Sequence, residues 1–296
     1  MTDDQPWTTS RLLNWTTDYL KGHDSESPRL DAEVLLAHCL NCERIALYTS
    51  FDSVPTPSQR ALYRDLVGKR AQQVPVAYLV GHREFYSLDF HVTKDVLIPR
   101  PETEFVVISL LDLVKEYPPQ PGKILQIADV GTGSGVLAVC AAKYLPRAHV
   151  TALDISAKAL QIARKNVAQH GVSEQVTLVE SDLFEGIDPA GQTFDFILSN
   201  PPYIGLQEME VVAQDVRENE PHVALFAGPQ GLDVITPLVS QATERVVSGG
   251  WFLMEISPHL ESSVVDLFNQ RKETWSVEST TKDLAGHARV IRARRI

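Results

Sequence analysis

The sequence predicts an α/β protein with a doubly wound, largely parallel sheet and a small helical domain ahead of it. Three observations predict this class. Short apolar stretches alternate with amphipathic ones beyond about residue 120, a glycine-rich turn follows the first of those stretches, and the first 75 residues show helical periodicity alone. Continuous apolar strands separated by amphipathic helices are typical of a parallel sheet that is covered on both faces.

The first predicted domain, residues 1–74, is a small helical bundle. Ser27 is a suitable N-cap residue and Pro28 suits the first helical position, directly before an apolar stripe at helical spacing. That stripe comprises Leu30, Val34, Leu35, Leu36, Cys39 and Leu40. Neighbouring helices are predicted over residues 11–20 and 58–72.

A connector is predicted between the helical domain and the rest of the chain. Residues 84–92 are rich in aromatic and apolar side chains in an extended pattern, which predicts a hairpin. We expect residues 75–100 to form this connector and residues 101–296 to form a second domain, which opens with a helix over 102–116.

The second domain alternates strands and helices. Strands are predicted over residues 124–130, 148–153, 175–180, 194–199 and 250–256 and near 275–280 and 288–294. Helices are predicted over residues 134–144, 156–170, 231–247 and 259–271. Because no helix separates the last two strands, we expect a terminal hairpin that inserts one antiparallel strand into the sheet.

Composition excludes several classes of protein. The chain of 296 residues has a formal charge of −11, which disfavours generic binding to nucleic acid backbones. No apolar run approaches the roughly 18 residues of a membrane span, and the acidic start is unlike a signal peptide, so we expect a cytoplasmic protein with no membrane partner. Cys39 and Cys42 form a lone C-x-x-C in a leucine-rich helix. Core packing explains them better than a metal, and no metal site is predicted.

A glycine-rich turn follows the first strand of the sheet. Its sequence is DVGTGSG at residues 129–135, and the glycines allow a ligand to approach the backbone closely. The second strand ends at Asp154, 23 residues after Gly131, where a carboxylate suits both hydroxyls of a ribose. The two features together predict a nucleoside site at the carboxyl ends of the strands.

The glycine spacing decides which nucleoside is expected. A dinucleotide fingerprint needs Gly or Ala at the position of Val136, which argues against an oxidoreductase. The G-x-G-x-G pattern after an acidic residue resembles S-adenosylmethionine-dependent methyltransferases of the Rossmann-like class I, which implies a seven-stranded, mostly parallel sheet. The expected cofactor residues are Gly131, Thr132, Gly133, Ser134, Gly135, Asp154, Asp182, Leu183 and Asn200. Asp182 is either close to the adenine or a turn cap.

A rigid slot is predicted at residues 200–203, NPPY, directly after the strand 194–199. Each proline fixes its own φ and favours extended geometry before it, so the Asn200 side-chain oxygen and the Pro201 carbonyl can both accept hydrogens from a planar NH2 group. Pro202 stiffens the slot, and Tyr203 can pack on the flat face of the group. A plain strand-terminating turn is the alternative. The motif resembles the (Asp/Asn/Ser)-Pro-Pro-(Tyr/Phe) sequence of methyltransferases that modify such nitrogens.

Motifs along most of the chain resemble the bacterial HemK family. They are PRLDAE at 28–33, PVAYLVG at 75–81, REFY at 83–86, VLIPRPET at 96–103, DVGTGSG at 129–135, NPPY at 200–203, EP at 220–221, AL at 224–225, GPQGL at 228–232 and DLAG at 283–286. The family comprises protein-(glutamine-N5) methyltransferases that act on peptide chain release factors. The resemblance implies that the helical domain holds a class 1 release factor and that the slot receives the glutamine of its Gly-Gly-Gln motif.

Two departures from the family pattern and several alternatives accompany this expectation. Residues 256–260, ISPHL, replace the usual Gly and Gln after Glu255, and Leu183 stands where some relatives have an aromatic residue. Residues 100–103 either start a helix or form a wall over the cofactor. An N6-adenine methyltransferase acting on DNA or RNA is the alternative function, although no basic, aromatic-rich recognition segment is visible. A non-catalytic binding module is disfavoured by the intact loop and slot.

Overall fold

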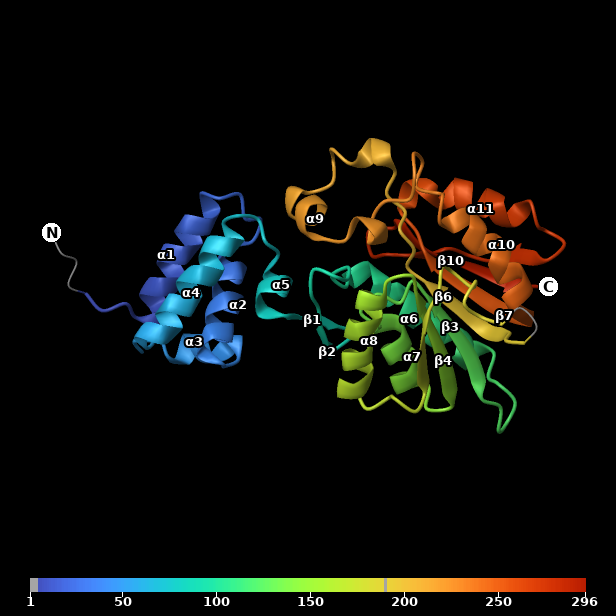
Figure 1. The fold of residues 1–296 in the computed structure, drawn as a ribbon, viewed down its shortest axis with the longest axis horizontal. Coiled ribbons are helices and arrows are strands. Elements are labelled where there is room, and N and C mark those ends of the chain that lie inside the picture. The colour runs from blue at the N-terminus through green and yellow to red at the C-terminus, as the bar shows by residue number, and fades with distance from the viewer. Residues whose placement is uncertain (1–4, 189–190) are drawn as a thin grey trace. The chain divides into compact units, whose positions relative to one another are not determined.

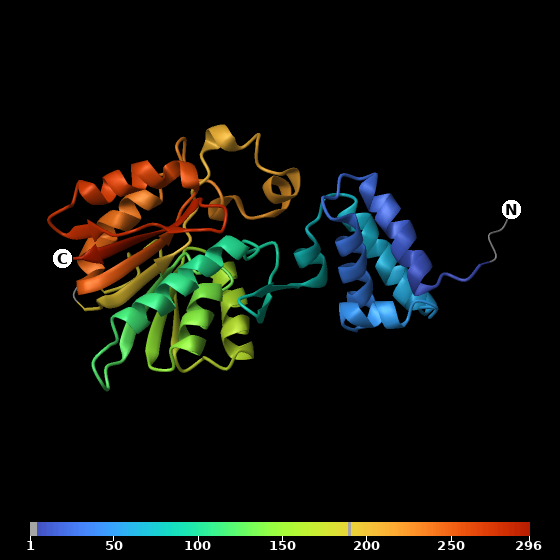
Figure 2. The same ribbon diagram turned by 180° about the vertical axis from the view of Figure 1, so that it is seen from behind.

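The structure, a computed structural model, describes residues 5–188 and 191–296 and divides into two compact units (Figures 1 and 2). One unit is the described part of Met1–His82 together with Ala213–Asn219. The other is Arg83–Val212 together with Glu220–Ile296, less the two undescribed residues. Each unit is described by itself.

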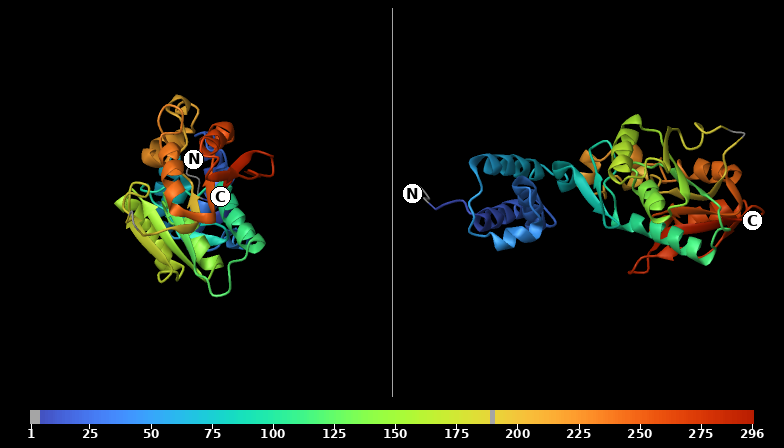
Figure 3. Two further views of the ribbon diagram at one scale, coloured as in Figure 1. Left: turned by 90° about the vertical axis from the view of Figure 1, so that its right-hand side faces the viewer. Right: turned by 90° about the horizontal axis from the view of Figure 1, so that it is seen from below.

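The helical unit has its own apolar core. Its helices, which can also be followed in Figure 3, are α1 (Thr9–Lys21), α2 (Pro28–Leu40), α3 (Arg44–Thr49), α4 (Pro57–Arg70) and α5 (Val76–Val80). The core is formed by buried side chains of α1, α2, α3 and α4, with Leu13, Leu35 and Leu36 almost completely enclosed. The α2 helix begins at Pro28 as predicted, but the Ser27 hydroxyl makes no capping hydrogen bond.

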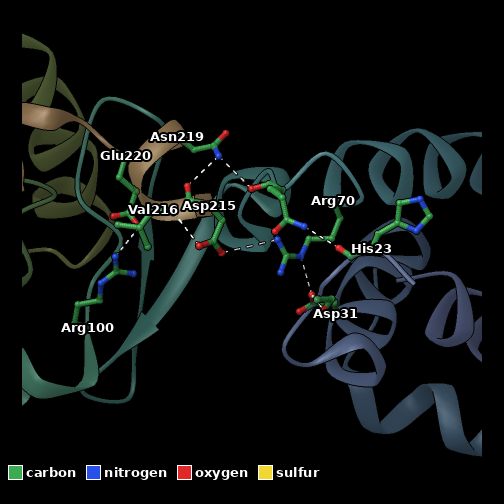
Figure 4. A network of polar contacts seen from close by, with 10 residues as sticks. His23, Asp31, Arg70, Arg100, Asp215, Val216, Asn219 and Glu220 are labelled. Atoms are coloured by element: carbon green, nitrogen blue, oxygen red, sulfur yellow. Dashed lines mark hydrogen bonds and ion pairs between the residues drawn. The ribbon is translucent and has the colours of Figure 1, made fainter. Parts of the chain in front are cut away.

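A short helix from much later in the sequence belongs to this unit. It is α9 (Gln214–Asn219), which the sequence did not predict. The Arg70 guanidinium donates from Nε to Asp31 at 2.7 Å, and its Nη1 lies 3.9 Å from Asp215 (Figure 4). Asn219 Nδ2 donates to the carbonyl of Gln73 at 3.1 Å. No residue of α9 is buried, so polar contacts rather than apolar packing join it to the helical unit.

The predicted connector contains more than a hairpin. Residues 76–80 form α5, which ends at Gly81 with a left-handed φ of 80°, and only then do β1 (His82–Phe85) and β2 (Leu88–His91) pair. Pro75 at the N-cap position and Gly81 at the C-cap position are typical helix boundaries, and they account for the turn of helix. Next, a 3₁₀ turn, η1 (Pro101–Thr103), leads into α6 (Glu104–Glu116).

The sheet of the second unit is mostly parallel, as predicted. Five parallel strands lie in the order β5 (Val176–Glu180), β4 (Ala148–Asp154), β3 (Leu125–Val130), β6 (Phe194–Ser199) and β7 (Val246–Glu255). Next comes β10 (Ala288–Arg295), antiparallel to both β7 and β8 (Trp275–Val277). The expected insertion of one antiparallel strand is confirmed. A two-residue strand, β9 (Thr281–Lys282), adds an eighth member beside β10.

Helices cover both faces of the sheet, which gives two apolar cores (Figure 1). On one face α6, α7 (Val136–Tyr144) and α8 (Ala157–Gln169) pack with side chains such as Ile127 and Leu253. On the other face α10 (Ile235–Arg245) and α11 (Glu261–Asn269) pack with Ala128 and Met254. Neighbouring residues of one strand therefore face opposite cores.

Some predicted boundaries were wrong. The helix predicted at 231–247 is the shorter α10, because the β-branched Val246 and Val247 begin β7 instead. Three 3₁₀ turns were not predicted, η2 (Leu206–Glu208), η3 (His222–Ala224) and η4 (Pro258–Leu260). Among the described residues, no helix combines the length and apolar character that crossing a bilayer requires.

Candidate active site

A cleft of about 190 Å³ lies at the carboxyl ends of β3, β4, β5 and β6. Most of the residues expected from the sequence line it, namely Gly131, Thr132, Gly133, Ser134, Asp154, Asp182, Leu183, Asn200 and Pro202. Gly135, Pro201 and Tyr203 are not among the lining residues. Parallel strands present their carboxyl ends at one edge of the sheet, which is why residues so far apart in sequence meet here.

The glycine-rich loop is held mainly through hydrogen bonds of its backbone groups to neighbouring elements. The amides of Gly131 and Thr132 both donate to the carbonyl of Leu153 at 2.8 Å. Gly133 has a φ of 57°, and a Cβ built on it would meet no atom within 4 Å, so the loop leaves open space on this side. The Ser134 carbonyl accepts a 2.7 Å hydrogen bond from the buried Asn166 side chain, which also bonds the backbone of His91 in β2.

Asp129 stabilises this loop through hydrogen bonds of its side chain. Its Oδ2 accepts hydrogen bonds from the Thr132 hydroxyl at 2.6 Å and from the Ala138 amide at 3.0 Å. The side chain is fully buried, and burial raises the pKa of its carboxyl to about 7. The carboxyl therefore ties the loop to the first turn of α7.

Asp154 lies at the end of β4 with its carboxylate in the cleft. Its Oδ2 accepts from the Gly133 amide at 2.8 Å and its Oδ1 from the Ser156 amide at 2.9 Å. Burial raises its pKa, and the two amides oppose that effect. Each carboxylate oxygen can accept a second hydrogen bond, so the pair is oriented to accept from a vicinal diol.

Asp182 and Leu183 reach the cleft from the turn after β5. Leu183 has a left-handed φ of 48°, and its carbonyl accepts a 2.8 Å hydrogen bond from the Ser181 hydroxyl. Ser181 in turn accepts from the Gly186 amide at 2.7 Å. Asp182 is exposed. The turn thus brings one apolar and one acidic side chain to the same wall.

The predicted slot follows β6 directly. Asn200 donates from Nδ2 to the Thr103 hydroxyl at 3.0 Å, and the Tyr203 hydroxyl donates to Glu255 Oε1 at 3.3 Å. Burial raises the pKa of Tyr203, which keeps its hydroxyl protonated. Asn200 lines the cleft, so its amide stands beside the space that Asp154 and the glycine loop enclose.

Two acidic residues at this end of the site were not predicted from the sequence as site residues. Glu255 ends β7 and is 1% exposed, and burial raises its pKa to about 7. Glu220 is 4% exposed and accepts from the Arg100 guanidinium at 2.6 Å (Figure 4). It also accepts from the Ile98 amide at 3.1 Å. Glu220 was noted only as part of the EP motif at 220–221, and Glu255 only by its place at a strand end.

Residues 100–103 take part in the wall of the cleft as well as in the start of a helix. Arg100 and Thr103 line the cleft. Residues 101–103 form η1, which leads directly into α6. Among the described residues, no cluster of three or more His, Cys, Asp or Glu side chains is arranged to hold a metal ion.

The fold and the site define a methyltransferase. Residues 111–223 match the methyltransferase small domain, and residues 11–81 match the PrmC N-terminal domain. The fold is similar to that of the N-terminal domain of human METTL16 in complex with SAH, with a TM-score of 0.52 and 15% identity over 78% of this chain and 83% of that one.

Close relatives share the whole length of the chain. A release factor glutamine methyltransferase of Rhodopirellula baltica is 48% identical over 98% of this chain and 97% of its own, and one of Koribacter versatilis is 42% identical over 94% and 95%. The chain belongs to the release factor glutamine methyltransferase family. This confirms the resemblance that the sequence motifs indicated.

Proposed function

We propose that this protein transfers a methyl group from S-adenosylmethionine to the side-chain amide nitrogen, N5, of the glutamine in the Gly-Gly-Gln motif of class 1 peptide chain release factors. The release factor is a protein partner, and the proposed place of action is the cytoplasm. The observation that carries the proposal is the Asn200 amide, whose NH2 group is engaged by Thr103 beside a nucleoside-sized cleft.

The cleft fits the proposed methyl donor. Gly131 and Gly133 line it and have no side chains to fill it, and the Asp154 carboxylate has acceptor capacity left for a ribose diol. Leu183 and Val223 contribute apolar surface for a base. S-adenosylmethionine supplies an electrophilic methyl group on a sulfonium, and the product is S-adenosylhomocysteine.

The slot fits an amide acceptor. A carboxamide nitrogen is a poor nucleophile because its lone pair is delocalised, so it must be held in line with the methyl carbon at about 3 to 3.5 Å. Asn200 Oδ1 and the Pro201 carbonyl would accept its two hydrogens and stabilise the positive charge that develops on it. The nitrogen forms the new bond to carbon, the sulfur keeps the electron pair of the broken bond, and the nitrogen then loses a proton to water.

The proposal is tested by incubating the protein with the donor and a purified class 1 release factor. We expect one added methyl group on the glutamine of the Gly-Gly-Gln motif, located by mass spectrometry of the peptides. A release factor in which that glutamine is replaced by Glu is the matched control. Methylation elsewhere, or none, contradicts the proposal.

The same assay distinguishes a release factor from nucleic acid as the methyl acceptor. Adenine also presents an NH2 group on a planar carbon, so DNA and RNA are offered in parallel with labelled donor. We expect no transfer to either, since the net charge of −11 opposes backbone binding. Faster transfer to nucleic acid than to release factor would favour the N6-adenine function instead.

A further inference from the structure

Arg100 is the one cationic side chain among the described residues that line the cleft. The other charged residues on the cleft wall are all acidic, namely Asp95, Asp154 and Asp182. The proposed methyl donor carries a positive sulfonium, a positive α-ammonium and one negative α-carboxylate. A mainly acidic wall suits the two cations, whereas the carboxylate needs hydrogen-bond donors of its own and is bound best by a cation.

The glycine-rich loop has few backbone amides left to bind that carboxylate. Free amides before a helix are a common anion site, but most of those in residues 131–135 already donate within the protein. The amides in use are those of Gly131 and Thr132 to Leu153, of Gly133 to Asp154 and of Gly135 to Thr132. At most the amide of Ser134 remains, so the main partner of a carboxylate here has to be a side chain.

The direction of the Arg100 side chain is set by its neighbours in sequence. Pro101 restricts the residue before it to extended geometry, and Arg100 accordingly has φ −99° and ψ 144°. Pro99, which also lines the cleft, has its own φ locked by its ring. The two prolines leave the backbone of Arg100 little freedom to lose, so little entropy is lost when a ligand binds.

Glu220 holds the guanidinium of Arg100 from the protein side. Its Oε1 accepts from Arg100 Nη2 at 2.6 Å, and its Oε2 accepts from the Ile98 amide at 3.1 Å. The Glu220 side chain is 1% exposed, whereas that of Arg100 is 30% exposed. A guanidinium has five N–H groups in a planar fork. The bond to Glu220 therefore orients Arg100 and leaves further hydrogens for an anion in the cleft.

The connectivity of the donor brings its carboxylate to the same wall. The sulfur carries the methyl group, the ribose C5′ and a short chain that ends in the ammonium and the carboxylate. With the ribose at Asp154 and the methyl group beside Asn200, that chain would leave along the remaining wall. Arg100 lies there, three residues before Thr103, which accepts from Asn200. Its charge also opposes the rise in the pKa of Tyr203.

We propose that Arg100, held in place by Glu220, binds the α-carboxylate of the methyl donor and so selects donors with an intact amino acid end. The inference rests on the proposed function, because it takes the cleft to be the donor site. It makes Arg100 a ligand-binding residue and Glu220 a positioning residue.

The test uses two ligands that differ in the carboxylate alone, S-adenosylhomocysteine and its decarboxylated analogue. Calorimetry with the full-length protein measures both Kd values. We expect the wild type to bind S-adenosylhomocysteine roughly 10- to 100-fold more tightly than the analogue, as a charge-assisted hydrogen bond implies. Arg100→Met should lose this discrimination. Its Kd for S-adenosylhomocysteine should rise by that factor, while its Kd for the analogue stays within about threefold of the wild type.

A second variant and a control guard against a change in folding. Arg100→Met leaves the buried Glu220 without its cation, which is destabilising. Arg100→Met combined with Glu220→Gln removes that charge, keeps an acceptor for the Ile98 amide and should lose the same discrimination. Arg147→Met is the control and should keep it, because Arg147 is exposed and precedes β4, at the edge of the sheet opposite the cleft. Thermal unfolding shows whether each variant is folded.

The binding measurements need no release factor, so they test this inference apart from the acceptor. A wild type that binds the two ligands equally would overturn it. So would equal weakening of both ligands in Arg100→Met and in the double variant, since a merely structural role predicts that result. Failure of the wild type to methylate a release factor, with the discrimination intact, would sink the proposed function alone.

Discussion

Asp129 and Glu255 are two buried carboxyl groups in the same sheet. Their hydrogen-bond partners lie at very different distances along the chain. Burial raises the pKa of each to about 7, and each has one buried oxygen without a hydrogen-bond partner among the described residues. The partners of Asp129 lie three and nine residues further along the chain. The hydrogen-bond partner of Glu255 among the described residues is the Tyr203 hydroxyl, which lies 52 residues earlier in the chain.

This difference extends to the two ends of the cleft. The end proposed to hold the donor, called the donor end, is built from the contiguous loop 129–135, whose backbone amides bond to Leu153 and Asp154. The end proposed to hold the acceptor, called the reacting end, depends on the side chains of Asn200 and Thr103, which come from separate elements. Substitutions at the donor end should therefore weaken binding of the methyl donor, whereas substitutions at the reacting end should lower the rate of methyl transfer.

The largest expected effect is that of Asn200→Ala. Removing one preorganised acceptor should lower kcat on the order of 100-fold or more, while donor affinity and folding stay close to the wild type. Steady-state kinetics with a release factor, together with calorimetry of donor binding, measure both quantities. Asn269→Ala, at the exposed end of α11, is the control and should behave as the wild type. Unchanged turnover in Asn200→Ala would show that Asn200 does not act in methyl transfer and would contradict the proposed reacting end.

Asp154→Ala should mainly weaken donor binding rather than lower kcat. Loss of the carboxylate proposed to accept from the ribose should raise the Kd for the donor roughly 10- to 100-fold, because hydrogen bonds to charged groups contribute about 1.5 to 3 kcal/mol. At saturating donor, kcat should fall far less than in Asn200→Ala. Asp154→Asn, which keeps one acceptor oxygen, should lie between the two. An unaltered Kd in the alanine variant would count against the diol role.

The same contrast explains what the sequence could predict. The glycine loop and Asp154 were predictable because spacing along one strand–turn–helix unit determines their geometry. The α9 helix was missed because its position depends on the buried Arg70, whose partner Asp215 is 145 residues away. Glu220 was missed for the same reason, since Arg100 and Ile98 precede it by 120 and 122 residues. Local periodicity carries no information about such pairs.

The smallest expected effect concerns stability, and it compares the two carboxyl groups directly. Both pKa values are raised above those of the unfolded chain, so the folded protein binds more protons between about pH 4 and pH 7. The stability that each group contributes is fully present below the unfolded pKa and is lost as the pH rises through the folded pKa. Each group should therefore lower the free energy of unfolding by up to about 1.4 kcal/mol per pH unit across that window.

Asp129→Asn and Glu255→Gln should each flatten this dependence. Urea unfolding at pH 5, 6, 7 and 8 measures it, and each variant should gain stability relative to the wild type as the pH rises. Since both hydrogen-bond partners of Asp129 lie in the glycine loop and in the first turn of α7, Asp129→Asn should keep the pH dependence of kcat. Glu255→Gln should lose it, because the Glu255 carboxyl accepts from Tyr203 of the NPPY motif and its pKa is raised to about 7. If Asp129→Asn also abolished the pH dependence of kcat, the two carboxyl groups would not be acting independently, and the division between a donor end and a reacting end would fail.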